Sequence, residues 1–123
     1  MQRRREAEGL GVLGGGIVKR FNDGMDMNRC YITGIRSGII ERHHVFGAAN
    51  RTRSTFYGFV VPLVAEIHPN GARRNDKRCK ELTGMSIKTL DWELKADCQA
   101  FYENDLGKTR EEFIEEFGRN YLE

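Results

Sequence analysis

The chain contains three histidines, and their positions are the first sign of chemistry. His43 and His44 are adjacent in "ERHHVFGAANR", and His68 follows "VPLVAEI" further along the chain. Neutral imidazole is a common ligand of divalent transition metals, and its ordinary pKa of about 6.5 also suits a general base near pH 7. The three side chains therefore predict a metal site with a base beside it, the plain alternative being histidines that only support the fold.

Local patterns indicate which elements would position these histidines. Residues 39–46 are rich in β-branched and aromatic side chains and predict a strand, residues 47–55 have the composition of a loop, and residues 56–61 predict a second strand. Pro62 is expected in the first turn of a short helix that ends near His68. This hairpin and helix would let one histidine of the pair share a metal ion with His68. Its neighbour would face the substrate, because adjacent strand residues point to opposite faces.

These segments resemble the HNH endonucleases, which are also called ββα-metal nucleases. "ERHHVFG" and "GFVVPLVAEIH" are similar to the family's histidine pair and to its segment with a metal-binding histidine. With "YGFVVPL" and the closing "TREEFIEEFGRNYL", residues 30–122 resemble small phage and prophage HNH-type and recombination-enhancement nucleases. The resemblance implies an α+β fold in which a β-hairpin and a short helix form the core and α-helices follow toward the C-terminus.

The resemblance also implies a role for individual residues. His43 and His68 become metal ligands, and His44 becomes the general base that deprotonates an attacking water. Asn50 is the catalytic candidate for the middle asparagine of the motif, with Asn70 as the alternative. The implied cofactor is a divalent ion, Mg²⁺, Mn²⁺, Ni²⁺ or Zn²⁺. The implied reaction is metal-dependent hydrolysis of DNA phosphodiester bonds with little sequence specificity.

Several positions depart from the family pattern. Val64 and Ile67 replace the cysteines of its "PLCxxCH" segment, and "CYITG" at residues 30–34 replaces a CxxC pair, so apolar packing is expected where some relatives hold structural zinc. Ala72 lies where many relatives place a further ligand. Two alternatives therefore stay open: a non-catalytic nucleic-acid-binding protein with a degenerate HNH fold, and a protein whose histidines hold a structural zinc ion.

Charge is distributed unevenly along the chain. Residues 1–80 carry 15 lysines and arginines against 7 acidic residues, whereas residues 81–123 carry 5 against 11. A basic region of this kind is typical of a polyanion-binding surface. The expected partner is DNA, double- or single-stranded, with RNA as a further candidate and solvated surface charge as the alternative. The candidate nucleic-acid-binding residues are Arg42, Arg51, Arg53, Arg73, Arg74, Lys77 and Arg78.

The 123 residues predict one folded domain. Residues 1–26, rich in glycine and charge, are expected to be flexible, and residues 27–123 to form the nuclease domain. Within it, residues 27–72 would be the ββα core, beginning with a short strand at residues 30–34, and residues 73–123 the helical scaffold. Glu41 is a candidate for orienting an imidazole, or else an exposed strand residue.

The scaffold has clear helical signals after a basic connector at residues 72–80. Thr109 and Glu112 form a capping box, and the helix that they open is expected to end at Gly118. An amphipathic stripe precedes it, formed by Ile87, Leu90, Leu94, Cys98 and Phe101.

Three widely spaced cysteines favour a reducing compartment, here the cytoplasm of a bacterial host cell. No apolar run approaches the roughly 20 residues of a membrane span, so no membrane partner is expected.

Overall fold

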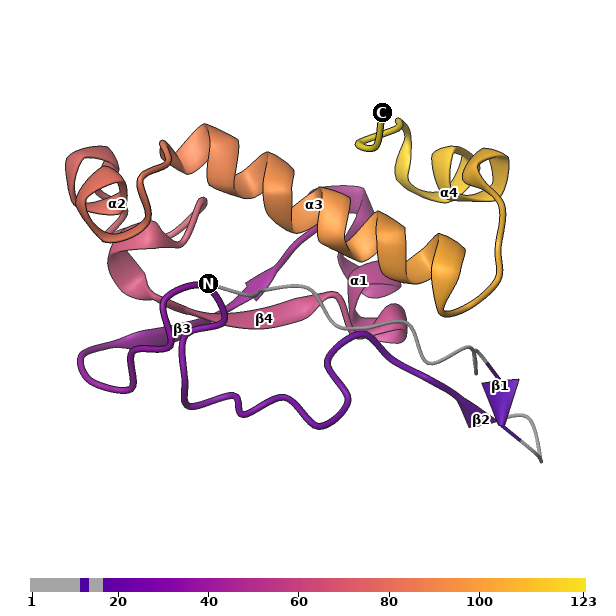
Figure 1. The fold of residues 1–123 in the computed structure, drawn as a ribbon, viewed down its shortest axis with the longest axis horizontal. Coiled ribbons are helices and arrows are strands. Elements are labelled where there is room, and N and C mark those ends of the chain that lie inside the picture. The colour runs from indigo at the N-terminus through magenta and orange to yellow at the C-terminus, as the bar shows by residue number, and fades with distance from the viewer. Residues whose placement is uncertain (1–11, 14–16) are drawn as a thin grey trace.

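The computed structural model describes residues 12–13 and 17–123. In this structure, one long helix crosses a two-stranded antiparallel sheet (Figure 1). The sheet consists of β3 (Ile40–His44) and β4 (Val60–Val64), and the long helix is α3 (Ile87–Asn104). The other elements are β1 (Val12–Leu13), β2 (Ile17–Val18), α1 (Arg51–Tyr57), α2 (Asp76–Thr83), α4 (Arg110–Phe117) and the 3₁₀ turns η2 (Ala48–Asn50) and η3 (Ala65–Ile67). The α+β class is confirmed.

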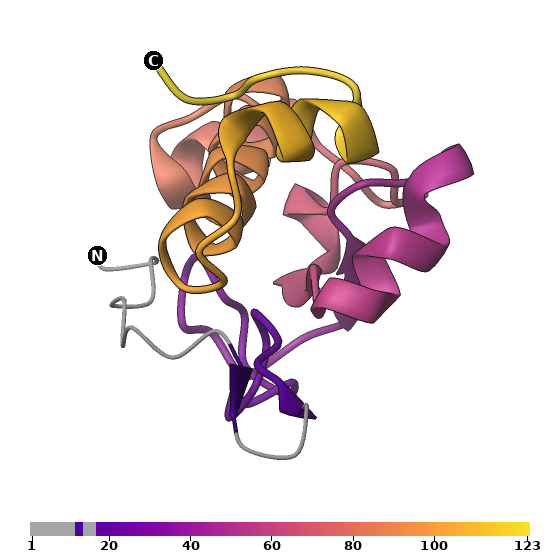
Figure 2. The ribbon, with the colours of Figure 1, turned by 90° about the vertical axis from the view of Figure 1, so that its right-hand side faces the viewer.

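α2, α3 and α4 lie on one side of the sheet, and the segment that precedes β3 runs along the other side (Figure 1). Figures 1 and 2 show α3 running over β3 and β4, with α1 at one end of the sheet and α4 beside the C-terminal half of α3. The core between these elements is strongly aromatic, and Phe59, Phe113 and Tyr102 are among its fully buried side chains. No helix in the described ranges is long and apolar enough to cross a membrane.

The strand predicted at residues 39–46 is confirmed as β3. His43 lies opposite Val61 and is 1 % exposed, whereas the neighbouring Arg42 is exposed. The alternation follows from the two-residue period of a strand, which sends neighbouring side chains to opposite faces. His43 therefore faces the interior, and His44 lies on the other face at the last position of β3.

Pro62 lies inside β4, so the prediction that it starts a helix was wrong. The backbone of Val45 donates to Phe59, and that of Ala65 donates to Ile39, which places the cross-strand bonds of the ladder at odd-numbered residues. At an even position such as 62, an N–H would point away from β3, so proline breaks no ladder bond there. After β4 the chain forms only the short turn η3 before His68.

The segment predicted as a loop at residues 47–55 contains most of α1. Its sequence, "RTRST", is polar and shows no apolar stripe. The helix is fixed by a tertiary contact, because the Ser54 hydroxyl donates to the Phe46 carbonyl at 2.6 Å and accepts from its N–H at 3.0 Å. Gly58, with φ of +75°, ends the helix, and the predicted second strand begins later, at Val60. The two strands are therefore joined by a helix rather than by a loop.

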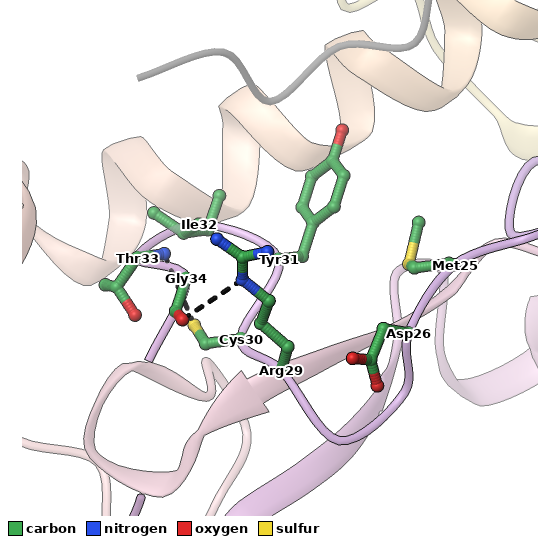
Figure 3. A pocket seen from close by; sticks show the side chains of 8 residues that line it. All are labelled: Met25, Asp26, Arg29, Cys30, Tyr31, Ile32, Thr33 and Gly34. Atoms are coloured by element: carbon green, nitrogen blue, oxygen red, sulfur yellow. Dashed lines mark hydrogen bonds between the residues drawn. The ribbon is translucent and has the colours of Figure 1, made fainter. Parts of the chain in front are cut away.

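Residues 30–34, predicted as a short strand, form a compact turn (Figure 3). The Gly34 N–H donates to the Cys30 carbonyl, the Thr33 N–H approaches the Cys30 sulfur at 3.5 Å, and the Arg29 side chain donates to Gly34. Tyr31 connects this turn to two other elements, because its N–H donates to Pro62 and its hydroxyl donates to Asp97 on α3. The turn therefore covers the edge of β4 that β3 leaves open.

The basic connector predicted at residues 72–80 includes the first half of α2. Asn75 caps this helix by accepting from the Arg78 N–H at 2.9 Å, Cys79 is its buried residue, and Gly84 ends it. The sequence did not predict α2, because a helix with a single buried side chain shows no apolar stripe.

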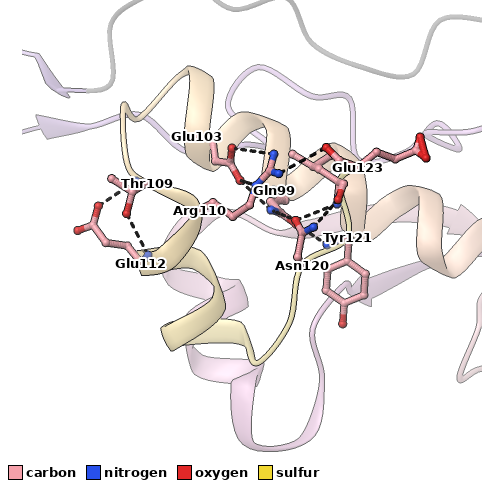
Figure 4. A network of polar contacts seen from close by, with 9 residues as sticks. Gln99, Glu103, Thr109, Arg110, Glu112, Asn120, Tyr121 and Glu123 are labelled. Atoms are coloured by element: carbon pink, nitrogen blue, oxygen red, sulfur yellow. Dashed lines mark hydrogen bonds and ion pairs between the residues drawn. The ribbon is translucent and has the colours of Figure 1, made fainter.

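The C-terminal helices were predicted correctly. α3 buries Leu90, Leu94, Cys98 and Phe101, and α4 begins with the predicted capping box and ends at Gly118. The chain beyond α4 is held against α3 by buried Gln99, which donates to Asn120 at 2.7 Å and accepts from the Tyr121 N–H at 2.7 Å (Figure 4).

The packed core begins before residue 27. Phe21 is 1 % exposed and contacts the rings of Phe59 and Phe101. Residues 1–11 and 14–16 of the segment predicted to be flexible lie outside the described residues.

Val64 and Ile67 belong to the same hydrophobic cluster as Cys30, as the prediction of apolar packing at these positions requires. All three cysteines are buried and free.

Two tyrosines share one partly buried carboxylate, and this arrangement predicts a response to alkali. The hydroxyls of Tyr57 and Tyr102 donate to the same Glu116 oxygen at 2.6 and 2.5 Å. Burial and this carboxylate raise the pKa of both tyrosines well above the ordinary value of 10.0. The unfolded chain therefore releases these protons first as the pH rises, so the folded state loses stability.

We expect the free energy of unfolding, measured in urea, to fall from about pH 9 to about pH 11. Tyr102→Phe should make this decrease shallower, because one titrating group is removed. Equal slopes for the two proteins would contradict the assignment.

Candidate metal and catalytic site

The structure brings His43 and His68 together, although they belong to different elements. Their ring centroids are 4.9 Å apart and the rings are nearly perpendicular, at 68°. β3 supplies His43, and the chain just after η3 supplies His68, since η3 turns the backbone directly at the end of β4. The contact predicted from the histidine spacing is present, although a 3₁₀ turn rather than an α-helix produces it.

His68 is held in a fixed orientation by a carboxylate. Its Nδ1 lies 2.6 Å from Glu41 Oε1, and both side chains are partly buried. Gly71 closes over this pair, because a Cβ at that position would lie 2.9 Å from both bonded atoms. A carboxylate on one ring nitrogen leaves the other nitrogen to bind a ligand, as in many metal-binding histidines. Glu41 therefore contacts an imidazole in the way expected of a residue that orients it.

His43 faces a second carboxylate on α3. Its Nε2 lies 3.9 Å from Asp91 Oδ1, beyond hydrogen-bond range, while Asp91 Oδ2 accepts from Lys95 at 2.8 Å. Burial lowers the pKa of His43 below 6.5, partly opposed by Asp91. Burial raises the pKa of the Asp91 carboxyl, but His43 and Lys95 outweigh that effect and leave it below 3.8. His43 is thus a neutral imidazole beside an ionised carboxylate near pH 7.

His44 lies on the opposite face of β3 from His43, among different neighbours. It is partly buried, and burial together with Arg51 lowers its pKa below 6.5, which leaves the imidazole able to accept a proton at neutral pH. Arg51 is exposed at the start of α1. Asn50 lies just before it, and its side-chain oxygen accepts from Arg53 at 3.0 Å. Arg51 is therefore a positively charged neighbour of His44.

The remaining predicted DNA-binding residues lie on two other parts of the surface. Arg42 is exposed on β3. The other four follow the turn that leaves His68: Arg74 donates to the Gly71 carbonyl at 3.0 Å, Arg78 pairs with Glu81, and Arg73 and Lys77 are exposed. Ala72, at the position where the family pattern suggests a ligand, is exposed in the same turn.

The side chains at this site fit a divalent metal by their chemistry. The unpaired, buried Nε2 of His43 lies close to the His68 ring and to the Asp91 carboxylate, and imidazole and carboxylate are both ligands of transition metals. Within the described residues, no three His, Cys, Asp or Glu side chains are already gathered as one ligand set. The predicted pair of histidines is therefore present, and the Asp91 carboxylate lies 3.9 Å from the Nε2 of His43.

Three residues of this site were not predicted from the sequence. Asp91 and Lys95 are four residues apart on α3, a spacing that usually marks an exposed helix ion pair, so it gave no sign of a site. Gly71 lies in "HPNG", a sequence typical of a turn. Its close approach to Glu41 and His68 became visible in three dimensions.

Comparisons with protein-family models, curated proteins and solved structures found no match for this chain.

Proposed function

We propose that the protein is a metal-dependent endonuclease of the HNH type, of phage or prophage origin, that hydrolyses DNA phosphodiester bonds with little sequence specificity. The observation that carries the proposal is the placement of the three histidines. His43 and His68 meet ring to ring at 4.9 Å, while His44 is held on the other face of the same strand end beside Arg51. This arrangement supports the division into metal ligands and base that the resemblance implies.

The residues take distinct roles in this proposal. His43 and His68 would hold the metal, with Glu41 fixing the orientation of His68. A divalent ion bound there would stabilise negative charge on the phosphate and on the departing oxygen. His44 would accept the proton of the attacking water, for which its lowered pKa keeps it neutral. Arg51 would bind a phosphate oxygen through its guanidinium, and Asn50, adjacent to it, would help to position the substrate.

The basic residues after His68 supply a second contact area for DNA. Arg73, Lys77 and Arg78 are exposed on the turn and on α2. Side chains of this kind bind the phosphate backbone without reading the sequence, and such binding weakens as salt is added. Little sequence specificity is therefore expected.

A plasmid-nicking assay tests the proposal. Supercoiled DNA is incubated with the full chain and Mn²⁺, Mg²⁺, Ni²⁺ or Zn²⁺ in turn, and nicked DNA is quantified with and without EDTA. We expect nicking that EDTA abolishes, and a decrease of at least about tenfold for His68→Ala, whose partly exposed ring can be removed without opening the core.

The outcomes separate the proposal from its alternatives. Nicking that persists in EDTA, or that is equal in His68→Ala, would show a contaminating nuclease and end the proposal. DNA binding without nicking would favour the non-catalytic alternative. A chelator-induced loss of thermal stability without DNA binding would favour a structural zinc ion.

A further inference from the structure

One buried atom in the described part of the chain lacks a partner, and it lies between the elements of the proposed site. The Nε2 of His43 is the buried side-chain nitrogen or oxygen among the described residues that has no hydrogen-bond partner. Buried polar groups are almost always paired, because an unpaired one has given up its hydrogen bond with water and gained none in return. This atom therefore points to a missing partner.

The atom that Nε2 faces could also serve as a ligand of a cation. Asp91 Oδ1 lies 3.9 Å away, too far to accept a hydrogen bond. If Nε2 carries the proton, a buried donor is unsatisfied. If it carries the lone pair, two acceptors face each other with nothing between them. A cation between them would satisfy both atoms, and ligand bonds of about 2.1 Å on each side span up to about 4.2 Å.

His68 is the third side chain at this position. Its Nδ1 is engaged by Glu41, and its ring lies against that of His43. Lys95 holds the other Asp91 oxygen at 2.8 Å, which leaves Oδ1 as the oxygen that faces His43.

We propose that Asp91 is the third protein ligand of the metal site and that His43, His68 and Asp91 together bind a transition metal ion. The inference rests on the proposed function for the existence of the site, and it adds both a ligand from α3 and a preference among metals. Two imidazoles and one carboxylate suit Zn²⁺, Mn²⁺, Co²⁺ or Ni²⁺ better than Mg²⁺, which prefers oxygen ligands and water.

Metal titration of the full chain tests this ligand assignment independently of catalysis. The protein is treated with EDTA, freed of chelator, and titrated with Co²⁺, Zn²⁺, Mn²⁺ and Mg²⁺ by calorimetry, with the visible absorption of Co²⁺ recorded in parallel. We expect one transition metal ion per chain, bound more tightly than Mg²⁺. Asp91→Asn should weaken binding on the order of 100-fold and change the Co²⁺ spectrum.

Two control variants isolate the ligand role. Glu115→Gln removes a carboxylate charge from an exposed position on α4 and should leave binding unchanged. Lys95→Met breaks the same ion pair as Asp91→Asn but keeps the carboxylate, so it should bind at least as tightly as the natural chain. Circular dichroism melting of each variant verifies that it is folded.

The results distinguish this inference from the nuclease proposal. Unchanged binding by Asp91→Asn, or an equal loss in Lys95→Met, would overturn the assignment of Asp91, even if the protein nicks DNA. Binding that depends on Asp91 in a protein that nicks no DNA would support the ligand assignment and refute the nuclease function.

Discussion

Alanine in place of Gly58 is expected to lower the melting temperature by about 10 °C. Gly58 ends α1 with φ of +75°, and an added Cβ would lie 2.7 Å from Arg20 Cβ and 3.0 Å from the Phe21 backbone nitrogen. The left-handed backbone alone costs alanine about 1 kcal/mol. Moving the backbone that carries buried Phe21 adds about 1–3 kcal/mol.

Gly84 provides a matched control for this substitution. It ends α2 with φ of +77°, but no atom lies within 4 Å of an added Cβ. Gly84→Ala should therefore show only the backbone cost, with a melting temperature about 4 °C below that of the natural chain. Thermal denaturation followed by circular dichroism compares the two variants. Equal losses would mean that the close approach of residues 20 and 21 contributes nothing.

His44→Ala is expected to reduce the rate of DNA nicking on the order of 100- to 10,000-fold, the contribution of a positioned general base. The loss should appear in kcat, because the side chain acts on the attacking water rather than holding the DNA. Metal affinity and melting temperature should change little, since His44 is only partly buried and lies on the other face of the strand from His43.

Imidazole added to the His44→Ala protein tests the role of base directly. A free base that enters the space left by the side chain should restore part of the lost rate, and the restored rate should rise with the concentration of neutral imidazole. The same addition should not restore His68→Ala to the same degree. An unaltered kcat in His44→Ala would remove this residue from the mechanism.

The elements predicted correctly from the sequence are those with strong local signals. β3 has its run of branched and aromatic residues, α3 has its stripe from Ile87 to Phe101, and α4 has the capping box. The errors occur where distant contacts decide the structure. α1 depends on Ser54 contacting Phe46, and the tolerance of Pro62 depends on its register with β3. Neither contact has a local signature.

The residues of the candidate site also divide into those that local sequence signals predict and those that distant contacts determine. The meeting of His43 and His68 could be predicted because His43 lies in one strand and His68 follows closely after the strand expected to pair with it. Asp91 could not, since its approach to His43 depends on the direction in which α3 crosses the sheet. An apolar stripe establishes that a helix packs, but it does not establish the crossing angle that decides which polar residue meets a buried histidine.

The three buried thiols provide a built-in probe of how the fold opens. Cys30 lies in the turn before β3, Cys79 on α2 and Cys98 on α3, and burial raises the pKa of the last two. Only a solvated thiolate reacts quickly with a disulfide reagent. Labelling followed by mass spectrometry would therefore rank the opening free energies of three separate parts of the chain under native conditions.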